Sequence, residues 1–357
     1  MSNGQLVPAK IPLTAEVEAE IVAKIEAENL QMEPRDADGE VTGRAQHPKN
    51  HGCVAAVFQV AGDVPQKYRH GVFTNPGARF NALIRFSNGR QQDDSKADVH
   101  GMAIKLLDVP GDRPAGQEWQ TAQDFVLIDD ELFFTGDLVD YEAANRIIAG
   151  GVENALSRRW LKFIPTLITG AQLEKLDGGK LLPRLQAVAD QRPASPLATN
   201  YWSSTPYALG PAAVKYMAVC PAPRQQPGAG QDRDYLRAAL AADLTAGPAS
   251  FDFVAHVQTD PHLQPIENPT VSWSANGASK VKLATITIPT QQVPSPSGLA
   301  ENIVYSPWNC LEAHAPLGKI NLARKQVYEG LSTTRHQGNG PDRQAWANVL
   351  PQDRRPV

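Results

Sequence analysis

The chain has 357 residues, a formal net charge of −4 and 42% hydrophobic residues. Normal apolar content with a small net charge excludes a mainly disordered chain, and the acidic balance argues against nucleic acid as the main partner. No apolar run reaches about 18 residues, so we expect no integral membrane segment. At roughly 150 residues per domain, the length is compatible with two domains or with one large domain.

Cysteine usage and the first residues suggest where the protein works. Cys53, Cys220 and Cys310 lie far apart and form neither a disulfide framework nor a CxxC zinc site. The N-terminus lacks a basic stretch followed by an apolar core, so we read no secretory signal. We therefore expect reduced thiols and a cytoplasmic location.

The predicted elements alternate between β-rich and helical stretches. Residues 13–31 predict an amphipathic helix with Thr14 as its N-cap, and this helix could dock on a second copy of the chain, which leaves a homodimer open. Gly, Pro, Asn or Asp bound the predicted strands, at 54–60, 81–87, 101–109, 123–128, 212–219, 250–257 and 279–288. Helical patterns cover 139–190, 234–245 and about 322–336. This order indicates an α+β fold rather than repeated βαβ units.

Several familiar motifs are missing from the sequence. It contains no GxGxxG, GxxxxGK[ST], HExxH or GxSxG. No motif therefore supports a common nucleotide-binding fold, a zinc protease or a serine hydrolase. The sequence leaves NADPH binding open.

The last predicted helix carries two arginines and a tyrosine on one face. Tyr328 and Arg335 lie 4 and 11 residues after Arg324, which at about 100° per residue places all three within about 40°. Cations stabilise a phenolate, and tyrosine is a known axial ligand of haem iron. An ordinary solvated helix face is the alternative.

Two further polar groups lie before the first predicted strand and within the second. Arg44 and His47 stand just before the first strand, with His51 four residues later, and such a histidine can serve as an acid/base catalyst or simply occupy a loop. In the second strand Arg85 and Ser87 alternate with apolar residues, so both point to one side, which is either solvent or the wall of a polar cavity.

In chain order, these segments resemble the haem catalase superfamily. Each piece is weak alone, but five in order over residues 44–335 are specific. The pieces are RAQHPK from Arg44, RFS from Arg85, DVHGMAIK from Asp98, DFV from Asp124 with a distant Phe133–Phe134, and RKQVY from Arg324 with the later Arg335. The length is similar to that of small catalase-related haem proteins, which lack the long arms and the extra C-terminal domain.

The resemblance implies a closed antiparallel β-barrel of about eight strands with surrounding helices, within a single catalase-like haem domain over residues 1–357. Residues 1–43 would form an N-terminal arm and helix, 44–290 the barrel with its helical insertion, and 291–357 the proximal helix and the tail.

The resemblance also implies haem b as the cofactor. Tyr328 would be the iron ligand, with Arg324 on its phenolate. His47, preferred to His51, would be the distal acid/base, and Ser87 would fix its tautomer. The remaining implied cofactor contacts are the propionate partners Arg44, Arg85 and Arg335, and Phe133 near the haem face.

The sequence departs from the family at the distal wall. Catalases carry an asparagine there that holds hydrogen peroxide, whereas an ungapped match places Ile128 at this point and Asp129 next to it. Asp129 would either act as an acid/base beside the iron or point to solvent. Gln46, before the distal histidine, could crowd or hydrogen-bond the peroxide site.

These departures favour a peroxidase or peroxygenase over a true catalase. The substrates would be hydrogen peroxide or organic and lipid hydroperoxides, with an organic or lipid molecule as the second partner. A catalase with residual dismutase activity, a hydroperoxide isomerase or synthase, and a non-catalytic protein that stores or senses haem are the alternatives.

Overall fold

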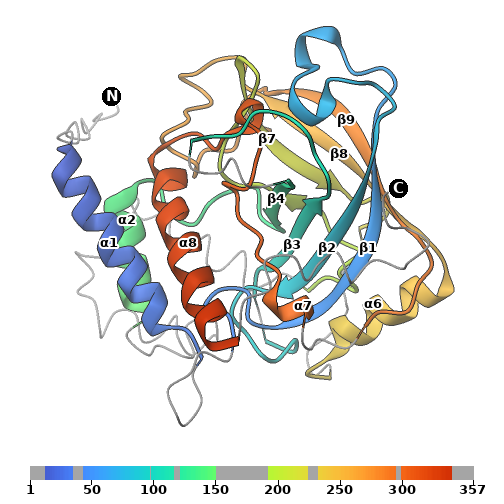
Figure 1. The fold of residues 1–357 in the computed structure, drawn as a ribbon, viewed down its shortest axis with the longest axis horizontal. Helices are drawn as coiled ribbons and strands as arrows, with labels where there is room; N and C mark the ends of the chain where they lie inside the picture. Colours follow the sequence, from blue (N-terminus) through green and yellow to red (C-terminus); the bar gives the residue numbers. More distant parts are fainter. Residues whose placement is uncertain are drawn as a thin grey trace, which may run out of the picture.

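The computed structural model describes residues 13–34, 43–96, 98–115, 121–149, 192–223, 232–294 and 299–339. In these ranges the strands form one antiparallel sheet in the order β5-β4-β3-β2-β1-β9-β8-β7-β6. β5 also pairs with β7, which closes eight strands into the predicted barrel and leaves β6 attached to β7 (Figure 1). The strands are β1 (Asn50–Val60), β2 (Arg79–Asn88), β3 (His100–Leu106), β4 (Gln123–Ile128), β5 (Tyr201–Trp202), β6 (Tyr207–Leu209), β7 (Ala212–Val219), β8 (Ala249–Val257) and β9 (Ser279–Ile288).

Side chains fill the barrel interior. Because side chains alternate along a strand, every second residue of each strand points inward. The centre is aromatic: the rings of Phe125 and Phe253 lie 4.8 Å apart, and Phe58 and Tyr216 lie 5.1 and 5.3 Å from Phe253. The barrel is therefore a packed core, and a ligand site has to lie outside it.

The side chains of the first strands that point out of the barrel form a second packed surface. Cys53, Leu83 and Ala103 belong to it and pack with Ile303 and Tyr305, which come from the chain before the last helix. Arg85 and Ser87 lie two and four residues after Leu83, so the alternation of side chains places them on this outer face of β2.

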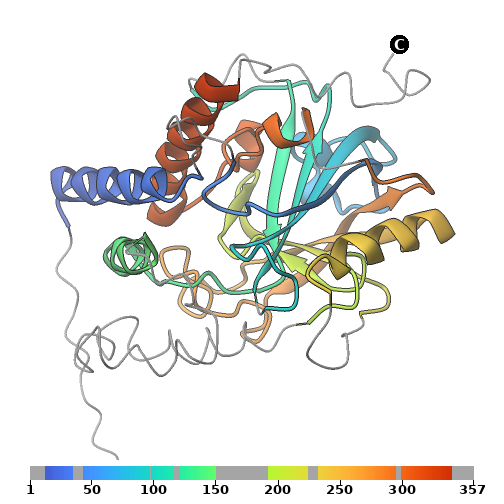
Figure 2. The ribbon, with the colours of Figure 1, turned by 90° about the horizontal axis from the view of Figure 1, so that it is seen from below.

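Helices cover two sides of the barrel. α1 (Ala15–Gln31), α2 (Leu138–Ala149) and α8 (Lys319–Asn339) lie on one side, and α6 (Tyr235–Ala246) lies on the other, as both views show (Figures 1 and 2). The short α7 (Leu299–Asn302) precedes α8. Three 3-10 turns, η1 (Gln66–Tyr68), η2 (Gly71–Phe73) and η4 (Glu312–His314), complete the regular elements of the described ranges.

The first helix is anchored on the last one. Lys319 of α8 forms an ion pair with Glu18 of α1, and Gln326 donates to Glu26 at 2.6 Å. Apolar residues of α1, α2 and α8 share a small core with Phe133. The N-terminal helix therefore packs against its own chain, and the structure leaves a homodimer as open as the sequence did.

Most predicted elements are present, but β1 begins at Asn50 rather than at Val54, and the short α7 was not predicted. β5 and β6 were not predicted, because two or three residues do not form a recognisable alternation. The predicted strand 101–109 ends at Leu106, and the last helix is longer than 322–336. The helical stretch 139–190 is confirmed as α2 up to Ala149, and its remainder lies outside the described residues. No described helix is long and apolar enough to cross a membrane.

Candidate functional site

His47 and Ser87 are in contact, as the sequence analysis expected. The Nδ1 atom of His47 lies 3.0 Å from the hydroxyl of Ser87. The backbone of His47 has a positive φ of 55° and donates to the carbonyl of Gly89 at 2.8 Å, which turns the loop so that the ring lies over β2 and β3.

A glycine makes this arrangement sterically possible. Gly101 of β3 lies opposite Ser87 in the sheet register. A Cβ at Gly101 would lie 2.6 Å from Nδ1 of His47 and 2.7 Å from the hydroxyl oxygen of Ser87. The imidazole therefore packs directly against the backbone of β3.

The surroundings keep His47 uncharged. Burial, followed by the nearby Arg85 and Arg44 guanidinium groups, lowers the pKa of His47 to about 3. At neutral pH the imidazole therefore carries no proton on its second nitrogen, and it is a weak base as long as the charges of Arg85 and Arg44 are not offset. The contact with Ser87 fixes the orientation of the ring.

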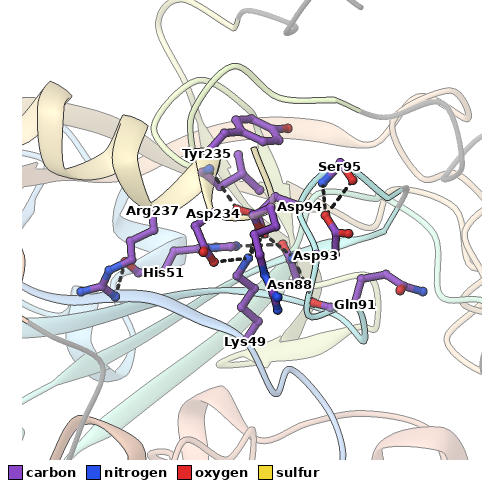
Figure 3. Close-up of polar contacts among 12 residues, drawn as sticks. Lys49, His51, Asn88, Gln91, Asp93, Asp94, Ser95, Asp234, Tyr235 and Arg237 are labelled. Atoms are coloured by element: carbon purple, nitrogen blue, oxygen red, sulfur yellow. Dashed lines mark hydrogen bonds and ion pairs between the residues drawn. The ribbon is translucent and has the colours of Figure 1, made fainter. Parts of the chain in front are cut away.

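His51 belongs to a structural network rather than to the His47 site. Its Nε2 lies 2.8 Å from the side-chain oxygen of Asn88, whose amide donates to Asp94 at 2.8 Å. Lys49 pairs with Asp94 at 2.6 Å and with Asp234 at 2.9 Å (Figure 3). This network ties the start of β1 to the end of β2 and the start of α6, in agreement with the choice of His47 over His51.

Tyr328 and Arg324 share one face of α8, as their spacing predicted. One terminal nitrogen of Arg324 donates to the hydroxyl of Tyr328 at 3.3 Å. The other donates to Thr205 at 2.8 Å and to Asn321 at 3.0 Å, which holds the buried guanidinium in place. A cation fixed one turn from a phenol stabilises its phenolate form.

The ring of Phe133 lies close to Arg324 of this pair. Its ring lies 6.0 Å from the guanidinium carbon of Arg324 and 5.3 Å from the ring of Tyr141. It shares its core with residues of α1, α2 and α8. The side chain therefore supports the helix that carries Tyr328.

Two buried arginines, Arg85 and Arg335, and the partly buried Arg44 come together from distant parts of the chain. Arg44 donates to the backbone carbonyls of Glu301 and Ile303, and Arg85 donates to the carbonyl of His47 at 3.0 Å. Burial and the neighbouring Arg335 and Arg85 hold the pKa of Arg44 well below its usual value. Burial lowers the pKa of Arg335 to about 10. The positive charges of the cluster oppose one another, and the carboxylates of Glu301 and, near Arg335, Glu33 offset part of this charge.

The arginines have donors left over. Among the described residues, Nε of Arg44, Arg85 and Arg335 and one terminal nitrogen of Arg335 have no hydrogen-bond partner. Buried guanidinium donors are normally paired with carboxylates or phosphates. The site therefore fits an anionic ligand with more than one acceptor group.

The structure does not support either expectation for Asp129. The side chain does not point to solvent, because it is 1% exposed. Its two oxygens accept from the backbone N–H and the Nδ1 of His100, both at 2.6 Å. Burial lowers the pKa of His100 and the Asp129 carboxylate raises it, and the balance lies above the usual value. We assign Asp129 to this buried pair and remove it from the catalytic set.

The side chains of Gln46 and Ile128 have different positions relative to the His47 site. The Gln46 amide donates to Asn29 of α1 at 2.9 Å, so the side chain turns toward the helix layer and does not crowd the site. Ile128, at the end of β4, aligns with Gly101 in the sheet and is only partly buried. Beside Gly101, the sheet therefore carries the apolar side chain of Ile128 that the ungapped match placed there.

Sequence reasoning did not assign a role to three residues near the site. Thr205 and Glu301 lie in segments without a periodic pattern, so no sequence signal marked them. Gly101 was inside a recognised motif, and the glycine itself was the available signal, because a glycine within a strand often marks a close approach. The described residues contain no group of three His, Cys, Asp or Glu side chains that could hold a metal ion.

Comparison with known proteins shows the fold. No family model matches the chain, and no curated protein matches it in sequence. It superposes on a fungal catalase with a TM-score of 0.62 and 14% identity, covering 94% of this chain and 66% of that one. For a bacterial catalase the values are 0.61, 15%, 92% and 62%, and for catalase A from Saccharomyces cerevisiae 0.62, 14%, 94% and 67%. The chain therefore has a catalase-like fold and spans about two thirds or less of the length of these enzymes.

Proposed function

We propose that the protein binds haem b and uses it as a peroxidase or peroxygenase. Tyr328 would be the iron ligand, His47 the acid/base, and Arg44, Arg85 and Arg335 the partners of the propionates. The catalase-like fold supports a peroxide-dependent oxidoreductase at the coarse level. The observation that carries the finer proposal is the His47–Ser87 contact beside arginines with unpaired buried donors.

The residues present fit the cofactor. Haem b carries two carboxylates, and the unpaired nitrogens of the three arginines are donors for carboxylates. The absence of a side chain at Gly101 keeps the imidazole of His47 against the sheet. Arg324 donates to the hydroxyl of Tyr328 and stabilises the phenolate that would bind the iron.

The protein residues have separate tasks in this mechanism. When bound, haem supplies an iron that activates a peroxide for oxidation of a second molecule. The neutral imidazole of His47 accepts a proton from the peroxide and returns it during the reaction, using Nε2, because Nδ1 faces Ser87. Ser87 is a positioning residue. Arg324 donates to the Tyr328 oxygen and is a positioning residue for it.

The distal wall favours an organic second substrate. Ile128 provides no amide to hold hydrogen peroxide, so efficient dismutation of two peroxide molecules is disfavoured. An apolar wall suits an organic reductant or a lipid hydroperoxide. The cytoplasmic location inferred from the cysteines belongs to this proposal as a further prediction.

The test is an optical spectrum of the protein produced with haem supplied. We expect a ferric, high-spin tyrosinate spectrum that Tyr328→Phe abolishes and Tyr68→Phe, the control on η1, retains. Addition of peroxide should change the wild-type spectrum, and a peroxidase assay should exceed oxygen evolution. A protein without a haem band would refute the cofactor, an unreactive spectrum would favour haem storage or sensing, and oxygen evolution at catalase-like rates would refute the peroxidase preference.

A further inference from the structure

A glutamate lies within the arginine cluster. Glu301 of α7 places one carboxylate oxygen 3.5 Å from a terminal nitrogen of Arg85 and 3.8 Å from Nε of Arg44. Its side chain is 30% exposed, whereas those of Arg85 and Arg44 are 3% and 12% exposed. A single, partly solvated carboxylate thus faces two buried cations.

These contacts are looser than the well-shielded Lys–Asp pairs of the described residues. Lys105 and Asp124 approach to 2.6 Å, and so do Lys49 and Asp94, all well shielded from solvent. Neither contact of Glu301 reaches hydrogen-bond distance, and Nε of both arginines has no hydrogen-bond partner in the described structure. Glu301 therefore offsets charge without satisfying the donors.

The arginine positions do not depend on this carboxylate. Arg44 is held by the backbone carbonyls of Glu301 and Ile303, and Arg85 by the carbonyl of His47. Loss of the Glu301 charge would leave these bonds intact. The carboxylate can consequently be displaced, or its charge removed, while the guanidinium groups stay where they are.

We propose that Glu301 competes with the haem propionates for Arg44 and Arg85 and thereby weakens haem retention. This inference rests on the proposed function and concerns the same site. Without haem, the carboxylate compensates part of the positive charge. With haem, the same carboxylate lies near the propionates as a like charge, so it raises the rate at which haem is lost.

The decisive experiment compares haem loss from wild-type protein and Glu301→Gln. Loaded protein is mixed with excess apomyoglobin as haem acceptor, and transfer is followed by absorbance. Because a partly exposed pair contributes up to about 1 kcal/mol, we expect haem loss to slow about fivefold. The difference should shrink in 1 M salt, where surface charges are screened. The variant without haem should melt at a lower temperature than the wild type, because the arginines then lack a compensating charge.

Two controls separate charge competition from a general effect on the fold. Glu312→Gln, an exposed glutamate on η4, should lose haem at the wild-type rate. With the iron complex of protoporphyrin dimethyl ester, which has no carboxylates, wild type and Glu301→Gln should behave alike.

Each outcome decides between the two proposals. Haem loss from Glu301→Gln at or above the wild-type rate overturns the inference and leaves the proposed function intact. A slower loss that is equally present with the dimethyl ester also overturns it, because carboxylates are then not involved. A wild-type protein that takes up no haem overturns both.

Discussion

Replacing Gly101 with alanine tests the geometry of the His47 site directly. The new Cβ would lie 2.6 Å from Nδ1 of His47, and ordinary contact begins at 3.4 Å, so one group has to move by 3.4 − 2.6 = 0.8 Å. β3 is paired on both sides, through Ser87 and Ile128, so the imidazole moves rather than the strand. This movement breaks the 3.0 Å contact with Ser87.

The expected cost follows from two contributions. Overpacking costs about 1–3 kcal/mol, and the lost hydrogen bond costs about 1 kcal/mol more. We therefore expect Gly101→Ala to lower the free energy of unfolding by about 2–4 kcal/mol, measured by urea denaturation of the haem-free protein. In the haem-loaded protein, the displaced imidazole should slow the reaction with peroxide by about 100-fold.

The matched control is Gly62→Ala. A Cβ at Gly62 would meet nothing within 4 Å, so this variant should unfold and react like the wild type. Equal stability and equal peroxide reactivity of the two alanine variants would refute the steric reasoning, and with it the placement of His47 against β3.

Two further predictions concern buried charge. Burial is the main cause that lowers the pKa of His47, His51 and His314 to about 3 from 6.5, so the stability these groups provide is present above pH 6.5 and is lost as the pH falls toward 3. At pH 5 each of these buried histidines should lower the free energy of unfolding by about 2 kcal/mol. Urea denaturation of His51→Gln should therefore show a weaker dependence of stability on pH than the wild type. An unchanged dependence would contradict the assignment. Asp129→Ala leaves the buried His100 unpaired and should cost about 3 kcal/mol of stability while the ferric spectrum persists; a normal stability with a lost spectrum would return Asp129 to the haem site.

The sequence allowed the strand framework to be predicted because its signals are local. Runs of apolar, β-prone residues with Gly, Pro, Asn or Asp boundaries mark long strands such as β1 and β8. β5 closes the barrel with only two residues, Tyr201 and Trp202, so its role depends on neighbours that a sequence window does not contain. Closure of the barrel was expected from the family resemblance, not from the pattern of these residues.

The site was predictable where a contact follows from regular geometry. Arg324 and Tyr328 are one helical turn apart, and their hydrogen bond is confirmed. The partner of Asp129 was not predictable in the same way, because the register between β3 and β4 places His100 beside it. The position of Glu301 depends on a segment without regular pattern, and only the three-dimensional structure reveals it.

The pairing of β1 with β9 has a consequence for how the protein is made. β1 emerges early in synthesis, but its partner on this edge, around Thr285 and Thr287, emerges more than 200 residues later. Until then, the four-stranded β1–β4 unit exposes an unpaired edge, which is a template for association with other chains. The residues proposed to bind haem are also made at different times. Arg44 and His47 are synthesised early, whereas Tyr328 and Arg335 are synthesised near the end of the chain. Under the proposed function, haem capture would have to follow completion of almost the whole chain, and production in cells should depend on protection of the nascent edge.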